Sequence, residues 1–160
     1  MNKFSFRILA ILFVTTYLAS CHKSDLPTDE SLIDCENCTF TYQENDGSKI
    51  VFSFREYWQG KKNSYGPYRG LLFEVPSGST AFDYGKEDIA SDKVNYGVMC
   101  VNCNVVPFQP VDGKIIGKKV NSNNWLVEAN VILQASNSDT RDTITFKQYF
   151  IKVPKLNPNP

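Results

Sequence analysis

Histidine is almost absent from this sequence. The chain of 160 residues contains one, His22, and it lies near the N-terminus, outside the body of the chain. Ser-His-Asp and Cys-His catalysis need an imidazole beside the nucleophile, and histidine-based zinc sites need one as a ligand. We therefore expect a protein that is not an enzyme, with no catalytic residues and no cofactor.

A surplus of positive charge is also missing. The 17 Lys and Arg residues are balanced by 17 Asp and Glu residues. Nucleic-acid binding depends on basic patches that neutralise phosphates, so we expect no nucleic-acid partner. The chain has enough apolar and aromatic residues, 42% and 13%, to favour a packed globule over a disordered chain.

Long hydrophobic runs are lacking as well. The apolar run Ile8–Val14 is too short to span about 30 Å of hydrocarbon. It follows the basic residues Lys3 and Arg7 and precedes a stretch of small residues, which together are typical of a secretory signal peptide.

The end of that stretch, Leu18-Ala19-Ser20-Cys21, resembles the lipobox of bacterial lipoproteins. The resemblance implies that residues 1–20 are a cleaved signal peptide, and that a lipidated Cys21 anchors the protein to a membrane. An Asp after the cysteine would resemble an inner-membrane retention signal. His22 stands there instead, which implies the outer membrane, on its periplasmic or its surface face.

The mature chain divides into three parts. Residues 21–34 are polar and without apolar periodicity, which predicts a flexible tether. Residues 35–153 are expected to form a single β domain. Residues 154–160 contain repeated prolines, which cannot donate to a strand ladder, and are predicted to be a coil.

Alternating apolar residues predict strands in the domain. The pattern is clearest around the turn residues 45–48, where Asp46-Gly47 favours a tight hairpin. After this turn, Ile50, Phe52, Phe54 and Trp58 share one face, which we expect to be the core, opposite to Ser53, Arg55 and Tyr57. Further strands are predicted at residues 68–75, 94–101, 114–120, 125–134 and 143–153, with a helical turn at 87–90.

These short strands, with turn signals about every 8–12 residues, predict an all-β fold. An antiparallel β-sandwich of about 7–8 strands is favoured because each strand has one apolar and one polar face. A small β-barrel with a filled interior is the alternative.

Two motifs of the form Cys-x-Asn-Cys supply the other four cysteines: Cys35, Cys38, Cys100 and Cys103. Export into an oxidising compartment favours disulfides, which we expect to connect the first motif to the strand near residue 100. Structural zinc held by four thiolates is one alternative. A redox-active pair is another, although the βαβ pattern typical of thioredoxin-like motifs is missing.

The longest interruption between the predicted strands is the loop at residues 59–67. Aromatic rings beside lysine and amide donors can bind sugars, and loops on rigid sheets concentrate binding residues. The candidate ligand-binding residues are Tyr57, Lys61, Lys62, Asn63, Tyr65 and Tyr68.

Asp142-Thr143-Ile144 resembles the acceptor sequence that some Gram-negative bacteria O-glycosylate, which implies a modification at Thr143. As a whole, the sequence favours an envelope lipoprotein that binds a glycan or an envelope protein partner. The alternatives are a structural subunit of an envelope complex and a histidine-independent glycosidase that uses two carboxylates.

Lipidation of Cys21 can be tested directly. The Cys21→Ser variant should be unprocessed or soluble, because stable membrane anchoring needs the acyl chains that the cysteine carries. Detergent-phase partitioning of the variant and the wild type measures this. Partitioning identical to the wild type would contradict the lipobox interpretation.

Overall fold

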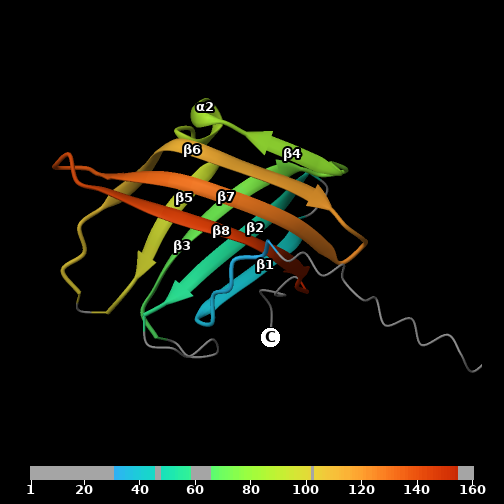
Figure 1. Cartoon of the computed structure of the whole chain (residues 1–160), viewed down its shortest axis with the longest axis horizontal. Helices are drawn as coiled ribbons and strands as arrows, with labels where there is room; N and C mark the ends of the chain where they lie inside the picture. Colours follow the sequence, from blue (N-terminus) through green and yellow to red (C-terminus); the bar gives the residue numbers. More distant parts are fainter. Residues whose placement is uncertain (1–30, 46–47, 59–65, 102, 155–160) are drawn as a thin grey trace, which may run out of the picture. The chain divides into compact units, whose positions relative to one another are not determined.

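The computed structural model describes residues 31–45, 48–58, 66–101 and 103–154. These residues form a sheet of eight strands and a short helix (Figure 1). The strands are β1 (Cys38–Asn45), β2 (Lys49–Tyr57), β3 (Tyr68–Pro76), β4 (Ala81–Tyr84), β5 (Val94–Met99), β6 (Phe108–Lys119), β7 (Asn124–Ala135) and β8 (Arg141–Lys152). The helix, α2, spans Lys86–Ile89. None of the described helical residues forms a segment long and apolar enough to cross a membrane.

The sheet consists of two antiparallel halves. One half has the order β1-β2-β3-β5 and the other β4-β6-β7-β8. Strands β1 and β8 join the halves through a short parallel pairing, in which Thr41 lies opposite Ile151 and Tyr42 opposite Lys152. In Figure 1 the strands β6, β7 and β8 cross those of the other half.

This arrangement confirms the all-β class with about eight strands. Each half is antiparallel, as expected for a sandwich. The halves nevertheless belong to one continuous, curled sheet, which brings the fold close to the barrel alternative. The pairing of β1 with β8 joins segments about a hundred residues apart, and alternation within a strand specifies its buried face but not its distant partner.

Aromatic side chains fill the space between the two halves. Phe52 on β2 stacks on Phe73 of the same half, with ring centroids 5.0 Å apart. It also meets Trp125 on β7 at 5.4 Å and Phe150 on β8 at 5.5 Å, both edge-on. All four rings are fully buried. Edge-to-face packing of this kind adds to the hydrophobic free energy gained by burying the rings.

The first hairpin confirms part of the predicted pattern. Ile50, Phe52 and Phe54 are buried, and Asn45 pairs with Lys49 across the turn. The prediction that Trp58 belongs to the core is wrong, because Trp58 is 49% exposed. Strand β2 ends at Tyr57, so Trp58 lies beyond the last strand pair and the alternation no longer applies to it.

Two strand boundaries differ from the sequence expectation. Strand β4 was not predicted, and β6 begins at Phe108, six residues earlier than expected, despite Pro110. Within the described residues, β4 pairs only with the later part of β6, so Pro110 lies where a missing N–H breaks no ladder bond on that side. A bulge follows Pro110, and Gly113 has a φ of 122°, which favours glycine.

Helix α2 confirms the predicted helical turn to within one residue. Its Ile89 is fully buried and belongs to the same core as the aromatic rings. The helix packs against β6 and β4, so it covers the core beside the edge of the sheet that β4 forms.

An arginine links the two halves on the core side of the sheet. Arg69 on β3 donates from Nε to Glu56 on β2 (2.6 Å) and from Nη1 to Asp142 on β8 (2.5 Å). Burial acts to lower the pKa of Arg69, but the hydrogen bond to Glu56 and the charges of Glu56 and Asp142 outweigh it and raise this pKa. Because two strands separate β3 from β8 in the sheet, the contact between Arg69 and Asp142 ties one half to the other.

Replacing this arginine should destabilise the fold. Arg69→Gln should lower the free energy of unfolding by about 1–3 kcal/mol, since it removes two charge-assisted hydrogen bonds from half-buried carboxylates. Lys49→Gln is a matched control, because its ion pair with Glu74 is exposed and should contribute less than about 1 kcal/mol. Urea denaturation measures both, and equal losses would contradict the role of Arg69 as a tie.

Candidate functional site

The four cysteines of the domain form two local disulfides. Cys35 pairs with Cys38 and Cys100 with Cys103, with Cα–Cα distances of 5.4 and 5.6 Å. The expected link between the two motifs is therefore wrong. A spacing of three residues allows the Cα separation that a disulfide requires without any long-range approach of the chain.

The zinc alternative required all four thiolates at one point, and the structure keeps them in two separate pairs. Among the described residues there is no group of three or more His, Cys, Asp or Glu side chains that could hold a metal ion. The two disulfides differ in environment, since Cys38 belongs to the buried core whereas Cys103 is exposed.

Three cross-strand rows of residues build a hollow on the face of β2, β3 and β5 opposite to the aromatic core. The pairing registers place Ser53, Leu72 and Asn95 in the first row, Arg55, Gly70 and Gly97 in the second, and Tyr57, Tyr68 and Met99 in the third. Two of the three residues in the middle row are glycines, so the sheet surface is open there. This glycine hollow has a volume of about 140 Å³ and is lined by Ser53, Phe54, Arg55, Tyr68, Gly70, Leu72, Gly97, Val98 and Met99.

Arg55, stacked on the ring of Tyr68, forms one rim of the glycine hollow. The guanidinium carbon of Arg55 lies 5.0 Å from the centre of the Tyr68 ring, a distance typical of a cation–π contact. The Tyr68 ring in turn contacts Tyr57, with centroids 5.5 Å apart. Tyr57 is only 9% exposed, so it supports Tyr68 and offers little surface of its own to a ligand.

The other walls of the glycine hollow are apolar and exposed. Leu72 is 48% exposed and Met99 is 51% exposed, and they stand in the rows on either side of the glycines. Large apolar side chains at this exposure contribute little to the core, so they remain available to contact a ligand.

The structure brings together two of the six predicted ligand-binding residues. Tyr57 and Tyr68 are partners at the ends of β2 and β3, and the predicted binding loop joins them. Lys61, Lys62, Asn63 and Tyr65 lie outside the described residues. Cys21 of the lipobox also lies outside them, whereas Thr143 is exposed at the start of β8 and its N–H donates to Asp142.

Sequence reasoning missed eight of the nine residues that line the glycine hollow, among them Arg55, Leu72, Gly97 and Met99. The alternation in β2 did place Arg55 on the polar face. The indication was weaker for the lining residues on β3 and β5, because their place in the hollow depends on which of them lie opposite Arg55. That register is a property of the assembled sheet.

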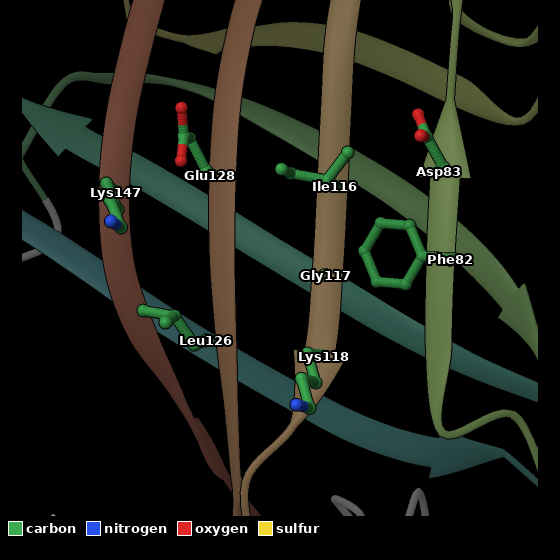
Figure 2. A pocket seen from close by; sticks show the side chains of 8 residues that line it. All are labelled: Phe82, Asp83, Ile116, Gly117, Lys118, Leu126, Glu128 and Lys147. Atoms are coloured by element: carbon green, nitrogen blue, oxygen red, sulfur yellow. The ribbon is translucent and has the colours of Figure 1, made fainter. Parts of the chain in front are cut away.

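A second hollow lies on the β4-β6-β7-β8 half (Figure 2) and has a volume of about 410 Å³. The β6–β7 hollow has Ile116 and Leu126 among its apolar residues, and Figure 2 shows the Phe82 ring beside Gly117. Its charged rim carries both signs, and Asp83 already pairs with Lys114 at 3.2 Å. It therefore presents no unbalanced charge to a ligand. Its lining residues are Phe82, Asp83, Ile116, Gly117, Lys118, Leu126, Glu128 and Lys147.

Comparison with known proteins yields no relative: no family model, no curated protein and no solved structure matches this chain. The function of this chain is therefore inferred from its own geometry.

The disulfide pairing can be checked by peptide mapping. Trypsin without reduction should release residues 24–49 and 94–114 as two separate peptides, because each contains one complete Cys-x-Asn-Cys motif. Each should become heavier by two hydrogens after reduction, as mass spectrometry can measure. A single species that joins the two peptides until reductant is added would show that the cysteines pair between motifs.

Proposed function

We propose that this protein is a lipid-anchored, non-catalytic binding module of the bacterial cell envelope, and that it binds a glycan at the glycine hollow. The observation that carries the proposal is the hollow itself, where Arg55, Tyr68, Leu72 and Met99 surround an open patch of sheet. Tyr68, which lines the hollow, directly follows in the sequence the longest predicted loop of the domain, which contains further aromatic and amide residues.

The chemistry of the rim suits a sugar. A pyranose ring has C–H faces that pack on apolar side chains such as Leu72 and Met99, and hydroxyls that accept hydrogen bonds from a guanidinium such as that of Arg55. The residues of the hollow stand on paired strands, which hold their positions before a ligand arrives and reduce the entropy that binding costs.

The anchoring part of the proposal rests on the sequence. Leu18-Ala19-Ser20-Cys21 resembles a lipobox, and the resemblance implies a membrane partner through acyl chains on Cys21. A lipid-anchored domain with a rigid binding face can capture envelope glycans near the membrane to which it is attached. The outer membrane is the compartment we propose, since His22 follows the cysteine.

Two observations support a non-catalytic role. The only histidine, His22, lies in the predicted tether. One pair of carboxylates, Glu56 and Asp142, faces the core side of the sheet, but Arg69 binds both. In a glycosidase the glycosidic oxygen or a water occupies the space between two such carboxylates, and here a guanidinium occupies it.

A second candidate is binding of an envelope protein partner, which a different observation favours. The segment after β5 exposes Met99 at 51%, Val101 at 83% and Val106 at 53%. Exposed apolar side chains gathered in one segment are typical of protein interaction sites, and the Cys100–Cys103 disulfide limits the conformations of this segment.

Glycan binding can be tested with the full-length lipidated protein in detergent on an array of bacterial envelope glycans. Leu72→Ala combined with Met99→Ala should weaken binding about tenfold, equivalent to about 1.4 kcal/mol. Because both side chains are exposed, the free energy of unfolding should change by less than about 1 kcal/mol. Ile116→Ala with Leu126→Ala, in the β6–β7 hollow, is the matched control and should leave binding unchanged.

Equal weakening by both pairs of substitutions would contradict a site at the glycine hollow. Absence of binding to every glycan, together with capture of one envelope protein that Val101→Asp abolishes, would favour the second candidate instead.

A further inference from the structure

We propose that the glycine hollow binds an acidic sugar, a pyranose ring that carries a carboxylate, with the carboxylate on Arg55 and the ring over Gly97. The inference rests on the proposed function and names the ligand class of that site. It depends on three features that lie together: an arginine without a carboxylate partner among the described residues, a glycine that the packing does not require, and apolar side chains on both sides of the glycine row.

The first feature is the charge of Arg55. Among the described residues no carboxylate pairs with it, and its described contact is the Tyr68 ring at 5.0 Å. Arg69, by contrast, is already bound by Glu56 and Asp142. Stacking on an aromatic ring holds a guanidinium in one orientation and leaves its N–H groups available. Arg55 therefore offers a positioned pair of donors, the arrangement that binds a carboxylate through two parallel hydrogen bonds.

The second feature is the contrast between the two glycines. At Gly70 a Cβ atom would overlap the backbone oxygen of Phe54, so the close approach of the strands requires glycine there. At Gly97 a Cβ atom would meet nothing within 4 Å, and the residue does not have a positive φ. Glycine in a strand lowers stability relative to larger residues. Packing does not require this cost at Gly97, and its effect is to keep the hollow open.

The third feature is the size and character of the walls. The volume of about 140 Å³ is close to that of engineered cavities of about 150 Å³ that hold one benzene ring. Leu72 and Met99 flank the glycine row and can contact the C–H face of a six-membered ring. No residue that lines the hollow is acidic, so an anion would meet attraction from Arg55 and no repulsion from the walls.

These features favour an acidic sugar over a neutral one. A neutral pyranose would use the walls but would leave the charge of Arg55 without a counterion. A small anion such as acetate would satisfy Arg55 but would leave Leu72 and Met99 uncovered. A carboxylated pyranose uses both, because its carboxylate can reach Arg55 while its ring lies over Gly97, which stands in the same cross-strand row as Arg55.

The experiment compares oligomers of galacturonic acid with their methyl esters, which keep the ring and remove the charge. Binding to the full-length lipidated protein in detergent is measured by isothermal titration calorimetry, with acetate as a third probe. The acid should bind at least tenfold more tightly than the ester, and added salt should reduce this difference because screening weakens the ion pair.

Three variants locate the interaction. Arg55→Gln should remove the preference for the acid, and Arg55→Lys should restore part of it, since lysine keeps the charge but not the paired donors. Gly97→Val should abolish binding of acid and ester alike while leaving the melting temperature equal or higher, because a Cβ atom at this position meets nothing within 4 Å and valine favours a strand. Arg141→Gln, an exposed arginine on β8, is the matched control and should change nothing.

Some outcomes would overturn the inference. Equal binding of acid and ester, or a preference for the acid that survives Arg55→Gln, excludes the proposed role of Arg55. If neutral glycans bind and Gly97→Val abolishes their binding, the glycan-binding function stands and only the acidic ligand class is wrong. If no sugar binds in any form, the inference fails together with the proposed function. Acetate binding as tight as that of the acid oligomer would show that the ring contributes nothing.

Discussion

The packing of aromatic rings between two halves of one sheet is the interaction on which this structure depends. The parallel pairing of β1 with β8 is described at only two residue pairs, too few to hold the halves together through backbone hydrogen bonds. Phe52 on one half instead contacts Trp125 and Phe150 on the other. Burial of these rings favours the curled sheet over an open one, because an open sheet would expose them to water.

Because buried apolar side chains take up one face of the long strands, functional residues can stand on the opposite face. The two arginines of β2 and β3 illustrate the division. Arg69 points to the core side, where Glu56 and Asp142 neutralise it and the contact ties the halves together. Arg55 stands on the opposite face, stacked on Tyr68 and without a carboxylate partner among the described residues. One arginine serves stability, and the other is available for recognition.

The two disulfides act locally and do not join the two halves of the sheet. Each closes a short loop next to a strand, Cys35–Cys38 at the start of β1 and Cys100–Cys103 after the end of β5. Local bridges of this kind restrict the conformation of one turn and leave the arrangement of the sheet to side-chain packing. The second bridge lies directly after Met99, a wall of the glycine hollow, so it also restrains the chain beside the proposed binding site.

Local patterns in the sequence were sufficient to determine the all-β class, the first hairpin and the buried face of β2, because alternation and turn residues act over a few positions. They failed at Trp58, where the strand had already ended, and at the cysteines, where each motif closed on itself. The row that joins Arg55, Gly70 and Gly97 was decided only by the tertiary structure. Its three members come from different strands, and the register that aligns them follows from packing the two halves around the aromatic core, which no local stretch of sequence specifies.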